Sequence, residues 1–205
     1  MKVLILSKTQ MHSGRCCIGG ISEKGEYVRL LTEGGENQQE TTELLPCQVW
    51  DIDYVKREHI FPPHIEDVIV RAKTFKYTLD DESKVIEIIK KLEAPVWAGS
   101  PNSLFDGKIK WTNNGSGYIN NPDIPSHSVG FWIPDNDLTK NEYNGIRYSH
   151  HYEEGWRSLK FVGYEDPVDK IPAGTLLRVS LARWWKPDGI DEERCYLQLS
   201  GWYNL

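Results

Sequence analysis

The sequences TLLRVSLARWW at residues 175–185 and RCYLQLSGWY at residues 194–203 contain the clearest strand signals in the chain. Leucine, β-branched and aromatic residues dominate both stretches, which is typical of strands that contribute to a core. Working outward toward the N-terminus, similar runs occur at residues 129–133, 147–152 and 158–164. The C-terminal half is therefore predicted to consist of strands.

The N-terminal half shows the same pattern with one interruption. Strands are predicted at residues 3–6, 26–32, 47–55 and 68–75. Residues 81–92 instead carry apolar side chains at helical spacing, and Pro95 ends that helix. Because strands and helices do not alternate along the chain, the pattern favours an all-β, mainly antiparallel fold over a parallel sheet.

The chain of 205 residues is long enough for two small barrels. We predict a first β-barrel at residues 1–78, a connecting helical segment at 79–94 and a second β-barrel at 95–205, with a loop-rich insertion at 99–128. A weak internal repeat suggests that the two halves are related. Pro46 and Glu66 lie on either side of one predicted strand, and Pro172 and Glu193 lie on either side of another, with nearly the same number of residues between them.

Composition narrows the class of function. The chain has a formal net charge of −6, so a nucleic-acid site would have to be a local basic patch. The apolar run at residues 3–6 is too short for the core of a signal peptide, and no run is long enough to span a membrane. We expect a cytoplasmic protein with no membrane partner.

Neither the cysteines nor the histidines form a recognisable metal or disulfide pattern. Cys16, Cys17, Cys47 and Cys195 match no CxxC zinc spacing and no disulfide scaffold, so we expect reduced thiols. The group His150, His151, Glu153 and Glu154 has metal-binding side chains, but neighbouring residues of a strand point in opposite directions. We predict no metal and no cofactor.

Several short motifs together resemble the bacterial dual OB-containing domain family. They are KTQMHSGRCCIGG at residues 8–20, YVRLL at 27–31, Glu66-Asp67, SLARWW at 180–185 and LSGWY at 199–203. The resemblance spans nearly the whole chain and implies two OB-type barrels. It also implies a nucleic-acid-binding or adaptor module, because OB barrels commonly bind oligonucleotides or oligosaccharides on one sheet face. Fold by itself does not assign that role.

The first candidate site is the N-terminal loop and its flanking strands, with Lys8, His12, Arg15 and, on the following strand, Arg29. A polar loop flanked by glycines allows backbone amides and cationic side chains to converge on a phosphate or carboxylate. The alternative interpretation is a structural loop in which His12 is hydrogen-bonded internally.

The second candidate site contains Arg183, Trp184 and Trp185, with Tyr203 on a strand expected nearby. Adjacent strand residues face opposite ways, so one of the two tryptophans should enter the core while the other faces outward. An outward ring beside a cation can stack a base, at roughly 1–3 kcal/mol. The alternative is that both rings fill a core or an interface.

These patterns predict a non-catalytic module that binds single-stranded nucleic acid or a nucleotide, with phosphates at the first site and stacked bases at the second. One alternative is a protein-interaction adaptor anchored by the same aromatic side chains. A second is a thiol-dependent enzyme in which His12 activates Cys16. The chain lacks the GxSxG, GxxxxGK[ST] and GxGxxG motifs of common enzyme classes.

Overall fold

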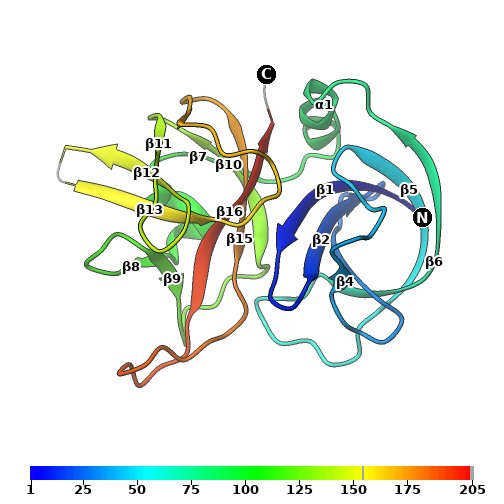
Figure 1. The fold of residues 1–205 in the computed structure, drawn as a ribbon, viewed down its shortest axis with the longest axis horizontal. Coiled ribbons are helices and arrows are strands. Elements are labelled where there is room, and N and C mark those ends of the chain that lie inside the picture. The colour runs from blue at the N-terminus through cyan, green and yellow to red at the C-terminus, as the bar shows by residue number, and fades with distance from the viewer. Residues whose placement is uncertain (154, 204–205) are drawn as a thin grey trace. The chain divides into compact units, whose positions relative to one another are not determined.

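The computed structural model describes residues 1–153 and 155–203, which fold into two compact units (Figure 1). The first comprises Met1–Ala94 together with Tyr203, and the second comprises Pro95–Trp202. Strands dominate both units, which confirms the predicted all-β class. The helix α1 (Ser83–Lys91) belongs to the first unit, whereas the sequence suggested a separate connecting segment.

The first unit is a closed five-stranded barrel. Its strands are β1 (Lys2–Gln10), β2 (Arg15–Ser22), β3 (Tyr27–Leu31), β5 (Gln48–Lys56) and β6 (Asp67–Thr78), and the short β4 (Gln38–Gln39) pairs with β2. The barrel closes because β1 pairs with both β2 and β5, with a register shift between Ile5 and Ser7. The β3–β6 pair is parallel, and the other pairs are antiparallel.

Close approach of β1 and β2 depends on a glycine. A Cβ atom at Gly20 would lie 2.7 Å from Val3 Cγ1 and 2.8 Å from the Leu4 carbonyl oxygen. Both distances are well inside van der Waals contact, so a side chain at this position would push the strands apart. The glycine-rich end of the N-terminal motif therefore serves the packing of the barrel.

The second unit repeats this order of strands. Its main strands are β10 (Val129–Pro134), β11 (Leu138–Asn141), β12 (Arg147–Tyr152), β13 (Gly155–Phe161), β15 (Leu176–Leu181) and β16 (Cys195–Tyr203). The sheet runs β11–β12–β13–β16–β15–β10, with β13 and β16 parallel. Only residues 135–137 separate β10 from β11, so we treat the two as one interrupted strand, and a further short strand pairs beyond each of them. We call this sheet the second barrel.

The two halves therefore correspond strand by strand. The interrupted strand β10–β11 takes the place of β1, and β15 and β16 take the places of β5 and β6. The weak internal repeat in the sequence coincides with β5 and β6 in the first unit and with β15 and β16 in the second. The core of the second barrel contains the fully buried side chains of Trp132, Tyr148, Leu159, Leu177 and Leu199.

Additional elements lie between α1 and β10, where the sequence predicted mostly loop. They are β7 (Val96–Gly99), the 3-10 segment η1 (Pro101–Gly107), β8 (Lys110–Trp111) and β9 (Gly117–Ile119), and β14 (Lys170–Ile171) later pairs with β11. The β8–β9 hairpin extends the second barrel, because β9 pairs with β16. None of the described helices combines the length and apolar character needed to cross a membrane.

Candidate functional site

The cations of the N-terminal loop are engaged within the first barrel. Arg15 Nη2 lies 2.7 Å from Glu36 Oε2, and its Nη1 donates to the Asn37 carbonyl at 2.8 Å. The side chain of Lys8 is buried and its Nζ donates to the Glu40 carbonyl at 2.7 Å. His12 is exposed at the turn between β1 and β2. The loop therefore has structural partners that the sequence did not show.

The side chain of Arg29 is even less accessible to a ligand than those of Lys8 and Arg15. Its side chain is buried, and Nη1 lies 2.9 Å from Asp67 Oδ1 in an ion pair that also includes Arg57, 3.2 Å from Asp67 Oδ2. A buried arginine whose charge is already met by a carboxylate cannot also contact a phosphate on the surface. The expected phosphate contact by Arg29 is therefore replaced by a structural role.

The Cys16 thiol does not fit the catalytic alternative. Its side chain is fully buried, and Sγ donates to the Gln39 carbonyl at 3.3 Å. Burial raises the pKa of Cys16, although the nearby Lys8 ammonium acts in the opposite direction. The thiol form is therefore favoured at neutral pH, and nucleophilic attack requires an accessible thiolate.

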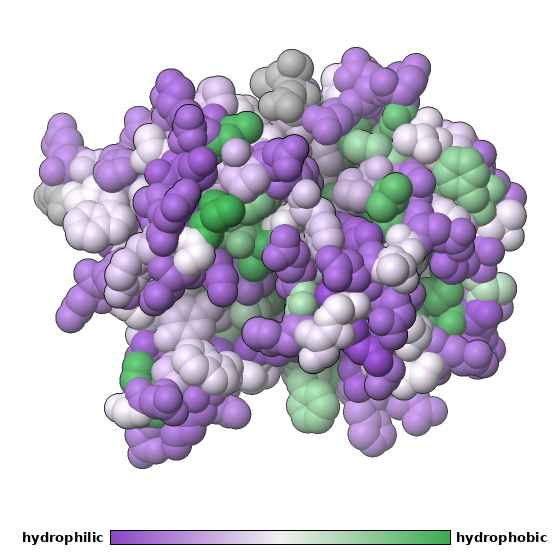
Figure 2. Space-filling model, viewed as in Figure 1, coloured by the Kyte–Doolittle hydropathy of each residue, from purple (hydrophilic) through white to green (hydrophobic). Residues whose placement is uncertain are grey.

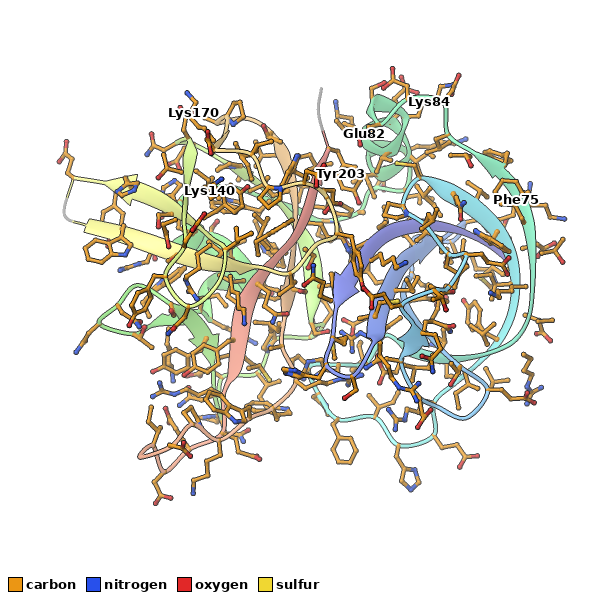
Figure 3. The ribbon with its side chains drawn as sticks, in the orientation of Figure 1. Phe75, Glu82, Lys84, Lys140, Lys170 and Tyr203 are labelled. Atoms are coloured by element: carbon orange, nitrogen blue, oxygen red, sulfur yellow. The ribbon has the colours of Figure 1, made fainter. Side chains whose placement is uncertain are left out.

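The aromatic residues of the second candidate site separate into two groups. Trp184 packs against the core of the second barrel, while 56% of Trp185 is exposed. Tyr203, labelled in Figure 3, is buried in the first unit, and its hydroxyl donates to the Leu6 carbonyl. Tyr203 therefore cannot stack a base as the sequence suggested.

A pocket of about 820 Å³ in the second barrel includes the exposed Trp185. Its lining comes from the start of β12, from β13, from the turn between β8 and β9, from the β11–β12 loop, from the segment after β15 and from part of β16. Its cations are Arg147, Lys160 and Arg183, and its rings belong to Tyr143, Trp156, Trp185 and Tyr196. Its other polar side chains are mainly amides and serines, and none of the lining residues is Asp or Glu. The volume lies within the range of typical ligand sites.

Two of these cations face each other across neighbouring strands. Arg147 on β12 pairs in register with Lys160 on β13, and Lys160 pairs with Gln198 on β16. Side chains directly opposite on antiparallel strands share a face of the sheet and lie close together. A row of two cations and one amide therefore crosses the floor of the pocket.

Neutral oxygen atoms hold the guanidinium group of Arg147. Its Nε and Nη2 donate to the hydroxyls of Ser158 and Ser116, both at 2.8 Å, and Nη2 also reaches the Ser158 carbonyl at 3.1 Å. No carboxylate of the described residues forms an ion pair with Arg147. Burial lowers the pKa of Arg147, but arginine stays protonated in proteins. The site thus contains a half-buried positive charge without a described counter-ion.

Two lysines on other strands of the barrel have carboxylate partners, unlike Lys160. Lys140 on β11 and Lys170 on β14, both labelled in Figure 3, lie 2.9 Å from Asp169 and Asp137. The hydrogen bond to Asp169 raises the pKa of Lys140, and the hydrogen bond from Lys170 lowers the pKa of Asp137. The absence of acidic side chains is therefore a property of the pocket and not of the whole barrel.

Sequence reasoning identified Arg183 and Trp185 and missed most of the pocket. Tyr143, Arg147, Trp156 and Lys160 were not predicted. The available signal was weak: Trp156 and Lys160 on β13 are exposed, but Ser158 between them is buried. Glu154, one member of the metal-like group at residues 150–154, lies outside the described residues. Of the others, His150 is buried with Nε2 2.7 Å from Asp135 Oδ1, and His151 is exposed.

The model of the dual OB-containing domain family matches residues 1–202. The chain belongs to that family. No significantly similar curated protein and no significantly similar solved structure was found. OB barrels bind ligands on the face of the second and third strands and on the loops between strands one and two and between four and five. In the second barrel of this dual OB-containing domain, β12, β13, the β11–β12 loop and the β15–β16 loop are those elements, and they line the pocket.

Proposed function

We propose that the second barrel binds single-stranded nucleic acid in the pocket over β12 and β13. The observation that carries this proposal is the composition of the pocket, which combines three cations and four aromatic rings and has no acidic side chain among its lining residues. In a chain of net charge −6, such a site is the local basic patch that a polyanion requires. The role is that of a binding module.

Arg147 and Lys160 are placed to contact phosphate. Like charges directly opposite each other on a sheet are destabilising, and an anion between them removes that repulsion. A guanidinium held by two serine hydroxyls is also oriented in advance, so little conformational freedom is lost on binding. Arg183, which is exposed, adds a third cation to the lining of the pocket.

The exposed rings favour bases as the second part of the ligand. Trp185 is 56% exposed and Trp156 48% exposed, both on the pocket wall. Large exposed rings beside cations provide stacking surfaces that accept any base, at roughly 1–3 kcal/mol each. Because the bases of a duplex are stacked on one another, these rings favour a single strand.

On the face of the molecule that Figure 2 shows, a protein partner is supported less well. On the face shown in Figure 2, the hydrophobic side chains form small separate areas among hydrophilic ones. Stable protein interfaces require a larger contiguous surface with an apolar centre. An acidic peptide could still use the cations of the pocket, so the experiment includes a polyanion without bases.

Fluorescence anisotropy with a short labelled homopyrimidine oligonucleotide at low salt tests the proposal. We expect the single strand to bind, the corresponding duplex to bind more weakly, and polyglutamate to compete poorly because it has no bases to stack. Absence of binding at low salt, or competition by polyglutamate as strong as by the unlabelled oligonucleotide, would contradict it.

A further inference from the structure

A second hollow adjoins the pocket. It has a volume of about 610 Å³ and shares Asn114, Ser116 and Tyr196 with the pocket. Its remaining wall comes from the inserted β8–β9 hairpin, with Trp111 and Tyr118 among the lining residues, and from the end of the β15–β16 loop. The two hollows therefore form one continuous track from β13 across β16 to the inserted hairpin.

Aromatic rings continue along this track. The ring centroids of Trp185 and Tyr196 lie 6.0 Å apart, and those of Tyr196 and Tyr118 also lie 6.0 Å apart. Tyr196 and Tyr118 are direct partners on the paired strands β16 and β9. Strand pairing thus fixes the last step of a row of three rings.

The charge of the second hollow differs from that of the pocket. Its one cation among the lining residues is Arg194, whose Nη2 lies 2.6 Å from Glu192 Oε1. The guanidinium also lies 3.9 Å from the centre of the Tyr118 ring, which holds that ring in place. Asn120 Nδ2 donates to the other oxygen of Glu192. With its cation already paired, the hollow offers rings and amides and not a phosphate clamp.

We infer that the ligand is an oligonucleotide longer than the pocket, and that the inserted β8–β9 hairpin provides a second nucleotide subsite in which Tyr118 stacks a base. This inference depends on the proposed function of the pocket. The centroids of the three rings follow one another at 6.0 Å along the two adjoining hollows. An oligonucleotide that follows this track extends beyond the pocket, with phosphates held in the pocket and a further base on the hairpin.

The hairpin is built firmly enough for this role. A Cβ atom at Gly117 would lie 2.9 Å from the Trp111 ring and 3.0 Å from Leu197 Cδ2, so the hairpin packs closely on β16. β9 also pairs with both β8 and β16. Tyr118 is consequently presented by a sheet and not by a free loop, which preserves its position for a ligand.

Binding measured against oligonucleotide length tests the inference. For Tyr118→Val, which keeps a strand-forming side chain, we expect about tenfold weaker binding of long oligothymidylates and unchanged binding of the dinucleotide. Trp185→Ala should weaken binding at both lengths, and Tyr118→Phe should retain wild-type affinity at both. Equal affinities of Tyr118→Val and wild type at every length would overturn the inference.

Cross-linking of the unaltered protein gives an independent test. Oligothymidylates with one photoreactive base at successive positions should yield adducts in residues 110–119 from a position near one end, and adducts near Trp185 from a neighbouring position. Adducts at the pocket with none on the hairpin would overturn the second subsite while leaving the proposed function intact. Failure of every length to bind would overturn both.

Discussion

Lys160 lies directly opposite Arg147 on the antiparallel strands β13 and β12, so two cations face each other on one side of the sheet. Opposed like charges reduce the stability of a sheet, and here neither residue has a carboxylate partner among the described residues. Lys140 and Lys170 in the same unit are both paired with aspartates. The barrel therefore retains an electrostatic cost where a bound anion would remove it.

Replacement of Lys160 by glutamate should separate stability from binding. Lys160→Glu places a carboxylate opposite Arg147, so we expect a gain of about 0.2–1 kcal/mol in the free energy of unfolding. Oligonucleotide binding should be largely abolished, because the new carboxylate occupies Arg147 and repels phosphate. Urea unfolding and fluorescence anisotropy measure the two effects. Lys170→Gln, outside the pocket, should leave affinity unchanged, and wild-type affinity of Lys160→Glu would contradict the assignment.

The adjacent tryptophans should differ in what they affect. Trp185→Ala should weaken oligonucleotide binding by roughly 1–3 kcal/mol and leave unfolding almost unchanged, because the ring is 56% exposed. Trp184→Ala should instead lower the free energy of unfolding by about 1.5–3 kcal/mol, because Trp184 packs against the core. Phe61→Ala, at an exposed ring in the first unit, serves as the control for both measurements. Reversed effects would contradict the placement of the rings.

The ion pair of the first barrel should matter for stability and not for binding. Asp67→Asn removes the carboxylate that forms an ion pair with the buried Arg29, and breaking a buried ion pair typically costs about 3–5 kcal/mol. Denaturant unfolding measures this decrease, and a binding titration of the folded fraction should give wild-type oligonucleotide affinity. Weakened binding by folded Asp67→Asn would instead return Arg29 to the ligand site.

Alkaline pH should destabilise the protein partly through Cys195. Burial raises the pKa of Cys195 from its ordinary value of 9.0 to about 12, against the effect of Arg183. Between these values the unfolded chain releases a proton that the folded protein retains. Stability is thus intact below pH 9 and decreases as pH rises toward 12, by about 1.4 kcal/mol per pH unit for this group. In urea unfolding, the stability of Cys195→Ala should decrease less steeply with pH than that of the wild type. The same pH dependence in both proteins would contradict the raised pKa of Cys195.

The fold could be predicted well because its signals are local. The run TLLRVSLARWW contains β15 (Leu176–Leu181), and the helical spacing at residues 81–92 contains α1 (Ser83–Lys91). Strand and helix periodicities are legible in a few consecutive residues. The insertion was predicted less well, because β8 and β9 are two and three residues long and form mainly through pairing with each other and with β16.

The site was harder to predict because it depends on register and on distant partners. Arg15 and Glu36, and likewise Arg29 and Asp67, are far apart in sequence, so their ion pairs were not visible and these arginines seemed available. Conversely, Arg147 and Lys160 become neighbours only once β12 and β13 are paired in register. Trp156 and Lys160 on β13 are exposed, but Ser158 between them is buried, so the pattern along this strand does not show which elements surround the site.

The central claim is that Arg147 and Lys160 bind phosphates of a single strand, and the salt dependence of binding tests it most directly. Oligonucleotide affinity should be measured across a range of salt concentrations for wild type and for the double variant Arg147→Gln/Lys160→Gln. We expect the slope of log affinity against log salt to become shallower by about 0.7 for each phosphate that the variant no longer neutralises. An unchanged slope would contradict the account.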